Sequence, residues 1–218
     1  MRPGRQGLVS AARQEFAERG YAAASVRDIA HRAGVSLSAL YYWYPGKHDL
    51  LAAILDEDLD HYFAACRDAL AAGGETAAEQ LAALVGATVR YRVDHPVRSS
   101  VVLSEGRSLQ PEQQAAYRRR LDEAADQFRT VIERGVASGE FSTPYPDDAR
   151  RAIIAACNDI TQWYRPDGAI GVDELARRYA DLALTIVGAS VPARRRGHRP
   201  DLTSGSDRGL CAGGHSGT

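Results

Sequence analysis

The sequence predicts an all-α protein with a small helical domain at its N-terminal end and a larger helical domain after it. Apolar residues recur with helical spacing along most of the 218 residues, and no segment alternates with the period of two that a half-buried strand requires. Glycine, proline and serine punctuate the chain at intervals that suit helices. These observations favour helices from end to end of the folded part.

The first helices are bounded by residues that end or cap a helix. Gly20 and Gly34 can end the helices before them, because glycine takes the left-handed conformation freely. Ser25 and Ser36 can cap the helices that follow, and Pro45 with Gly46 ends the third. The first four helices are therefore expected over 5–19, 26–33, 37–44 and 47–70.

The later helices follow from periodicity and from prolines and glycines between them. They are expected over 77–94, 97–109, 111–137, 147–164 and 173–189. The last residues are rich in glycine, serine, arginine and proline and hold too few apolar residues to bury a core. The predicted organisation is a first domain over 1–48, a second over 49–190 and a disordered tail over 191–218.

Composition narrows the function classes. No apolar run reaches the ~20 residues that cross a bilayer, and the first residues lack the apolar segment of a secretory signal. The three cysteines, Cys66, Cys157 and Cys211, match no metal or redox spacing. We therefore expect a cytoplasmic protein with no membrane partner and no cofactor.

Charge is distributed unevenly along the chain. Residues 1–50 carry seven Arg and Lys against four Asp and Glu, whereas residues 51–191 carry fifteen against twenty-two. A basic N-terminal segment joined to an acidic body favours contact between the first fifty residues and a polyanion.

Residues 25–51, SVRDIAHRAGVSLSALYYWYPGKHDLL, contain two short helices joined by a tight turn at Gly34. Such a pair is a helix-turn-helix, whose second helix lies in the major groove of DNA. One arc of that second helix holds Leu37, Leu40, Tyr41 and Tyr44. The other arc holds Ser38, Ala39, Tyr42 and Trp43.

These residue types suit contact with DNA. Small side chains allow close approach to base edges, while hydroxyl and indole N–H groups donate to phosphate oxygens. The ammonium of Lys47 and the free N–H groups at the start of its helix can jointly hold a phosphate. The expected base-facing residues are Leu37, Ser38 and Ala39. The full set of expected DNA contacts is Ser25, Arg27, Ser36, Leu37, Ser38, Ala39, Tyr41, Tyr42, Trp43 and Lys47.

The pattern alone also fits a plain helical core, since glycine-broken helices and aromatic helix ends are common. Residues 20–51, however, resemble the DNA-binding domain of the tetracycline-repressor (TetR) family. The resemblance rests on the Gly20-Tyr21 pair and on the segments VRDIA, AGVS, LYY and KHDLL with their spacing. It implies a transcriptional regulator, most often a repressor, that binds a double-stranded DNA operator as a homodimer and holds a small-molecule effector in its C-terminal domain.

The C-terminal body resembles one branch of that family, in the segments LSEGRSLQPEQQAAYRRRLDEAADQFRTVIERGVASGEF and NDITQWYRPDGAIGVDELARRYADLALTIVG. The resemblance implies regulation of lipid or sterol catabolism and response to acyl-CoA thioesters. An acyl-CoA needs an apolar tunnel with cations at its mouth for the phosphates. The candidates are Arg107, Arg118 and Arg165 for the mouth, and Tyr91, Phe128 and Trp163 for the wall. Each arginine also fits a solvated helix face, and Trp163 also fits a core or a dimer interface.

The last two predicted helices carry apolar residues in helical rhythm, at Ile153, Ala156, Cys157 and Ile160, and at Leu175, Tyr179, Leu182 and Ile186. By analogy with the family they would form a four-helix bundle with a second copy. Two reading helices would then lie about 34 Å apart and require a near-palindromic operator.

Two other classes of function compete with this one. An enzyme is disfavoured, because the sequence has no phosphate-binding loop, no nucleophile elbow and no pair of histidines at metal spacing. The remaining alternatives are a similar regulator of an efflux or unrelated catabolic operon with a different hydrophobic effector, and a DNA-binding module that responds to no ligand.

Overall fold

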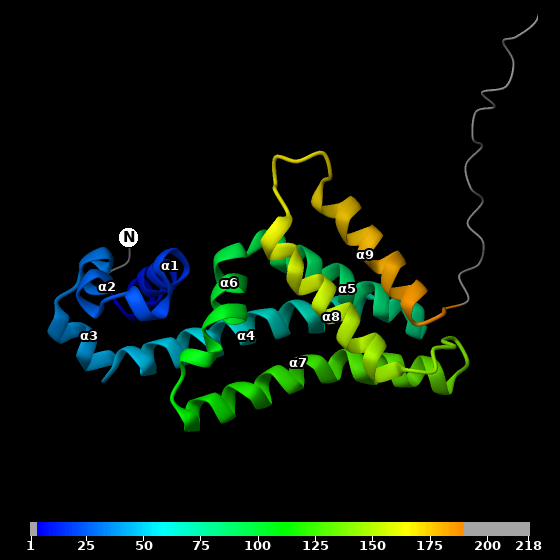
Figure 1. Cartoon of the computed structure of the whole chain (residues 1–218), viewed down its shortest axis with the longest axis horizontal. Coiled ribbons are helices and arrows are strands. Elements are labelled where there is room, and N and C mark those ends of the chain that lie inside the picture. Colours follow the sequence, from blue (N-terminus) through cyan, green and yellow to red (C-terminus); the bar gives the residue numbers. More distant parts are fainter. Residues whose placement is uncertain (1–3, 190–218) are drawn as a thin grey trace, which may run out of the picture.

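The computed structural model describes residues 4–189, and within them every regular element is helical. The all-α prediction is confirmed for this range. Figure 1 shows the elements in chain order. Their bounds are α1 Arg5–Ala23, α2 Val26–Ala33, α3 Leu37–Trp43, α4 Lys47–Ala72, α5 Ala77–Asp94, α6 Pro96–Glu105, the 3-10 turn η1 Gly106–Ser108, α7 Pro111–Ala137, α8 Pro146–Trp163 and α9 Val172–Ile186.

The boundaries differ from the predicted ones by more than two residues in three places. The first helix continues past Gly20 to Ala23, with a kink at Gly20, whose φ is 75°. The predicted helix over 97–109 is divided into α6 and η1, which brings Gly106 under the ring of Tyr117. A Cβ on Gly106 would lie 2.2 Å from Tyr117 Cε1, so only glycine fits this close approach. The last helix ends three residues earlier than 189, because Gly188 adopts a left-handed φ of 63° and closes the helix end.

Helices α1, α2 and α3 gather at one end of the molecule, and α4 leads from them into a larger body (Figure 1). In that body α5 packs against α4, α8 and α9, and α7 lies alongside α4. The expected boundary between residues 48 and 49 falls in the first turn of α4, so this helix belongs structurally to both parts. The predicted tail, 191–218, lies outside the described residues.

One continuous hydrophobic core connects the two parts. It includes Phe16 from α1, Leu40 from α3, Leu51 from α4 and Phe128 from α7. Within residues 4–189 no helix combines the length and the apolar character that crossing a membrane requires.

Candidate functional site

The turn between α2 and α3 is held by the residues that the sequence singled out. Ser25 Oγ accepts the N–H of Asp28, and Ser36 Oγ accepts the N–H of Ala39, each at 3.1 Å. Gly34 adopts a φ of 68° and a ψ of 31°, the left-handed conformation that favours glycine. The cap uses a lone pair of the Ser25 oxygen, so the hydroxyl hydrogen of Ser25 remains available to a phosphate, whereas Ser36 Oγ also shares a hydrogen bond of 2.9 Å with Ser38 Oγ.

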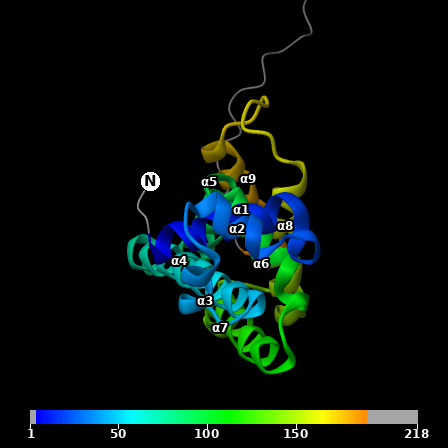
Figure 2. The ribbon, with the colours of Figure 1, turned by 90° about the vertical axis from the view of Figure 1, so that its left-hand side faces the viewer.

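Helix α3 exposes most of its surface at the end of the molecule seen in Figure 2. Leu40 and Tyr44 are buried, while Tyr42 is 81% exposed and contacts Trp43 edge to face at 5.3 Å. Ser38 is exposed and Ala39 is half-buried beside it. The arc of Ser38, Ala39, Tyr42 and Trp43 is therefore available to a partner. We call these four residues the reading face.

On the other arc of α3, Tyr41 is 46% exposed, as its expected contact with DNA requires, although Leu40 and Tyr44 beside it are buried. Leu37 was expected to face bases, but it is half-buried and packs against the hydrophobic core.

The ammonium of Lys47 has a structural role in place of the predicted phosphate contact. Lys47 Nζ donates to the carbonyl oxygens of Tyr21 at 2.7 Å and Ala24 at 2.9 Å, and lies 4.3 Å from the centre of the Tyr21 ring. The unsatisfied carbonyls at the end of α1 attract this cation. Lys47 thereby ties the end of α1 to the start of α4.

Several cations near α2 are already paired. Arg32 binds Glu15 at 2.8 Å and Glu18 at 2.6 Å, and Arg19 lies 3.5 Å from Glu15. Arg27 is exposed and makes no ion pair with any residue in 4–189. The sequence predicted two phosphate-binding cations, Arg27 and Lys47. Of these two, Arg27 is the one without an ion pair or a hydrogen-bonded partner among the described residues.

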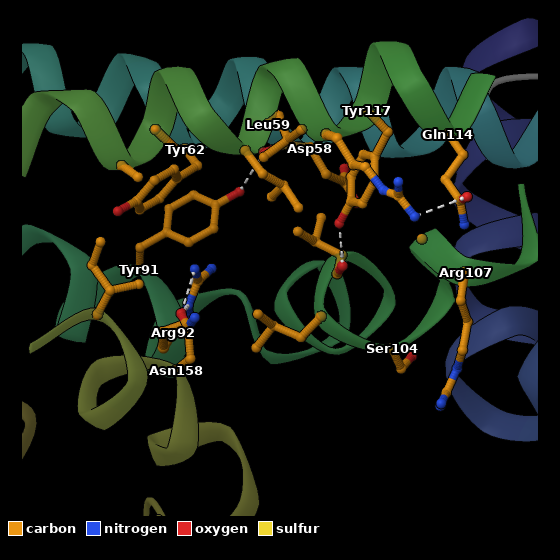
Figure 3. A pocket seen from close by; sticks show the side chains of 18 of the residues that line it. Asp58, Leu59, Tyr62, Tyr91, Arg92, Ser104, Arg107, Gln114, Tyr117 and Asn158 are labelled. Carbon is orange, nitrogen blue, oxygen red and sulfur yellow. Dashed lines mark hydrogen bonds between the residues drawn. The ribbon is translucent and has the colours of Figure 1, made fainter. Parts of the chain in front are cut away.

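A second candidate site is a cavity of about 560 Å³ in the body (Figure 3). Residues from α4, α5, α6, η1, α7 and α8 line it. The apolar part of the lining includes Leu59, Val102, Leu103, Leu121, Phe128 and Ile154. A volume of this size accommodates a small organic ligand.

Four of the six predicted ligand-binding residues lie around this cavity, namely Tyr91, Arg107, Arg118 and Phe128. Trp163 and Arg165 do not. Trp163 ends α8 on the outside of the body, 43% exposed and stacked on Tyr179 with ring centres 6.5 Å apart. Arg165 lies in the following loop, where it donates to the carbonyl of Tyr164 at 3.0 Å. Both follow the buried part of α8, which carries them beyond the cavity.

The cavity contains polar residues that the sequence reasoning missed, notably Asp58, Tyr62, Arg92, Tyr117 and Asn158. Burial raises the pKa of the Tyr91 and Tyr117 hydroxyls to about 12, so both stay protonated at neutral pH. Tyr117 donates to the carbonyl of Val102, and Tyr91 donates to the carbonyl of Asp58 at 3.0 Å. A carboxylate on the apolar stripe of α4 was the signal that could have revealed this site.

Asp58 joins the cavity to α1. Its carboxylate is fully buried and accepts from Arg13 of α1 at 2.9 and 2.7 Å, and from Arg98 of α6. Burial raises the pKa of Asp58, and the two guanidinium groups oppose that shift by stabilising the carboxylate. Three helices therefore depend on one charge that also lines the cavity.

The outer surface of α8 and α9 carries exposed apolar residues. Leu182 is 57% exposed and Ile186 is 42% exposed, and Trp163 and Tyr179 continue the same surface. Ile153, Cys157, Ile160 and Leu175 are buried inside the body, whereas Ala156 is exposed. No group of metal-ligating side chains occurs among the described residues.

Comparison with known proteins agrees with both parts of the fold. Residues 8–54 match the family of bacterial regulatory proteins called the tetR family, and residues 74–187 match the tetracyclin repressor-like C-terminal domain. The chain is 33% identical, over 83% of its length and 89% of the relative's, to the HTH-type transcriptional repressor KstR2 of Rhodococcus jostii.

Two solved structures are also similar. A regulatory protein of the tetR family from Rhodococcus RHA1 is 30% identical with a TM-score of 0.80, over 85% of this chain and 97% of that one. AibR, in complex with isovaleryl coenzyme A and operator DNA, is 18% identical with a TM-score of 0.72, over 84% of this chain and 98% of the AibR chain. At that identity the likeness to AibR concerns the fold.

Proposed function

This chain belongs to the tetR family of bacterial regulatory proteins, and from this premise we propose that it is a transcriptional repressor released from DNA by a small-molecule effector. It acts as a homodimer on a near-palindromic operator, and the effector is an acyl-CoA thioester. The observation that carries the proposal is the bridge from the cavity to α1 through Asp58 and Arg13.

The reading face supplies operator recognition. The backbone of α3 can approach base edges closely at Ser38 and Ala39, and Tyr42 and Trp43 can reach the phosphates. Ser25 and Arg27 at the start of α2 can hold the backbone on the other side of the groove. Tyr41, which is 46% exposed, can make the phosphate contact expected of it.

The dimer is supported by the exposed apolar surface of α8 and α9. Leu182, Ile186 and Trp163 are large apolar side chains in water, and a two-fold copy of the same surface would bury them. Such a pairing leaves α3 of each copy free, since α8 and α9 lie in the body and α3 lies at the opposite end (Figure 1).

The effector class follows from the lining of the cavity. A largely apolar interior accepts an acyl group, and Arg107 and Arg118 supply cations for phosphates. Arg118 is held by Gln114 Oε1 at 3.1 Å and has no carboxylate partner among the described residues. The complex of AibR with isovaleryl coenzyme A supports this class, because AibR is a protein of the same fold.

Release requires that the effector favour one of two arrangements of the chain. An occupant of the cavity contacts α4 beside Asp58, and a shift of that carboxylate changes its ion pair with Arg13 in α1. The reading helices of the dimer would then no longer match the spacing of the half-sites.

The test is a fluorescence-polarisation titration on the DNA upstream of the chain's own gene, with a panel of acyl-CoA thioesters. We expect tight dimeric binding that at least one thioester releases. Arg118→Ala should raise the releasing concentration about tenfold, as for a lost charge-assisted contact. Its neighbour Arg119→Ala is the matched control, because Arg119 is exposed outside the cavity.

Each other outcome removes a defined part of the proposal. Tight binding that no thioester disturbs would retain the repressor and discard the acyl-CoA effector, in favour of another hydrophobic effector or none. Equal effects of Arg118→Ala and Arg119→Ala would discard the cavity as the effector site.

A further inference from the structure

One guanidinium lies in the cavity without an acidic partner. Arg92 of α5 is only 7% exposed and lines the cavity, yet it forms no ion pair with any acidic residue in the described range 4–189. Buried charges are as a rule paired, because an uncompensated charge away from water is costly. Asp58, the only acid in the described lining, is already bound to Arg13 and Arg98. The charge of Arg92 is therefore left for an occupant of the cavity.

The neighbours of Arg92 fix its orientation and leave donors unused. Its Nε and Nη2 both donate to Asn158 Oδ1, at 3.2 and 2.9 Å, and its Nη1 makes a long contact of 3.5 Å to Ser99 Oγ. A guanidinium has five N–H groups, so part of this set has no acceptor in the protein. Because Asn158 Oδ1 is the acceptor, its amide nitrogen presents two more donors. The pair therefore offers donors and positive charge together.

The adjacent tyrosines hold the guanidinium without neutralising it. Its central carbon lies 5.0 Å from the ring centre of Tyr62 and 5.8 Å from that of Tyr91. Thr88 donates to the carbonyl of Leu84 at 2.8 Å, so it accepts from the Tyr62 hydroxyl 2.9 Å away. The Tyr91 hydroxyl donates to the backbone carbonyl oxygen of Asp58. Both hydroxyls have thus committed their hydrogens elsewhere.

Arg92 and Asn158 lie at one end of the cavity, and Arg107 and Gln114 lie at the other (Figure 3). Arg118 binds Gln114 and belongs to that second end. Apolar side chains such as Leu103, Leu121 and Phe128 form part of the lining. The cavity therefore has two cationic ends and a largely apolar interior.

We propose that Arg92 and Asn158 form an inner subsite for a carboxylate, so that the effector carries an acid group at the far end of its apolar part. The planar guanidinium fork matches a carboxylate with two parallel hydrogen bonds, and the Asn158 amide adds a further donor. This inference rests on the proposed function only in placing the effector in this cavity. It deepens the effector class from an acyl-CoA to one with a free distal carboxylate.

The test is isothermal titration calorimetry with two matched pairs of probes. The first pair is the monothioester of octanedioic acid with CoA against octanoyl-CoA. The second is free octanedioate against free octanoate. Wild-type protein should bind the CoA monothioester of octanedioic acid at least ~10-fold more tightly than octanoyl-CoA. This factor is the scale of one charge-assisted bidentate contact.

Three variants locate the preference. Arg92→Met keeps an unbranched apolar side chain, removes the charge, and should abolish the preference. Arg92→Lys keeps the charge without the fork and should retain only part of it. Arg107→Met, at the opposite end, should weaken both thioesters alike and leave their ratio unchanged. Circular dichroism and thermal unfolding establish that each variant is folded. If Arg92→Met fails to fold, Asn158→Ala replaces it and should reduce the ratio.

The outcomes separate this inference from the proposed function. A preference for octanedioate among the free acids, with no binding of either thioester, would support the subsite and refute the acyl-CoA effector. Equal affinities within both pairs, no binding of any probe, or a preference that survives Arg92→Met would overturn the subsite.

Discussion

The two candidate sites are held in opposite ways. The reading face is exposed, and nearby capping residues hold its helix in place. Ser25, Gly34 and Ser36 all lie within a few residues of the helix ends that they stabilise. The cavity lies among the helices of the body, and its buried carboxylate, Asp58, is compensated by Arg13 and Arg98 from distant helices. A change on the reading face should therefore affect binding more than folding, whereas a change of a buried charge should affect folding first.

The largest effect is expected from Asp58→Ala. Removal of this carboxylate leaves the buried Arg13 and the half-buried Arg98 with only the half-exposed Glu57 as an acidic partner, and the free energy of unfolding should fall by about 3 kcal/mol, the low end for a broken buried pair. Urea unfolding followed by circular dichroism measures it. The matched control is Asp56→Ala on the same helix. Asp56 is 62% exposed in its ion pair with Arg120, so its loss should cost only ~0–1 kcal/mol. Equal losses would show that the buried bridge is unimportant.

The next effect should appear in binding and not in folding. Tyr42→Ala removes the most exposed ring of α3 and should weaken operator binding by roughly 1–3 kcal/mol. The free energy of unfolding should change by less than about 0.5 kcal/mol. Fluorescence polarisation on the operator and urea unfolding measure the two quantities. Tyr145→Ala, at another exposed tyrosine just before α8, should alter neither. Unchanged operator affinity in Tyr42→Ala would mean that another surface of α3 faces the DNA.

A smaller effect on folding is expected at the cap of the reading helix. Ser36→Ala removes the acceptor of the Ala39 N–H and should lower the free energy of unfolding by ~1 kcal/mol. Ser38→Ala removes a hydroxyl two residues later that caps nothing, so thermal unfolding should be nearly unchanged. If both variants lose the same stability, the Ser36–Ser38 hydroxyl contact and not the cap supports α3.

The smallest effect concerns pH. Burial, the neighbouring His61 and Arg98 lower the pKa of His95 below its usual 6.5. Folded protein then takes up this proton at lower pH than the unfolded chain, so protonation favours unfolding. Stability should be complete above pH 6.5 and decline as the pH falls below it, by less than about 1 kcal/mol because the ring is partly solvated. Urea unfolding at pH 7.5 and 5.5 should show a smaller decline for His95→Gln than for wild type; an equal decline would locate the titration elsewhere.

The sequence predicted most of the reading face because its supports are local. Ser25, Gly34 and Ser36 act within one or two turns of the helices they bound, and their residue types specify those roles. The hydrogen bonds of Lys47 were not predicted, because its partners are distant in the sequence. The partners of Lys47 are carbonyls at the end of α1, more than twenty residues earlier, and periodicity within α3 and α4 contains no trace of them.

The cavity was predicted only in part for the same reason. Tyr91, Arg107, Arg118 and Phe128 were chosen by residue type, and the fold brings them together from three elements, α5, η1 and α7. Trp163 and Arg165 have equally suitable chemistry but follow the last buried turn of α8. Asp58, Arg92 and Asn158 were missed because each meets its partner across 40 or more residues: Asp58 meets Arg98, and Arg92 meets Asn158. Such pairings depend on how helices cross.

The most direct test of the central claim, that cavity and reading face are coupled, is a linkage measurement. The releasing thioester is titrated calorimetrically into free protein and into protein saturated with operator. Coupling requires that operator weaken thioester binding by the same factor by which thioester weakens operator binding. We predict that these two factors agree and exceed about fivefold. Equal thioester affinity in the presence and absence of operator would contradict the account, because a ligand that does not distinguish the two states cannot release the DNA.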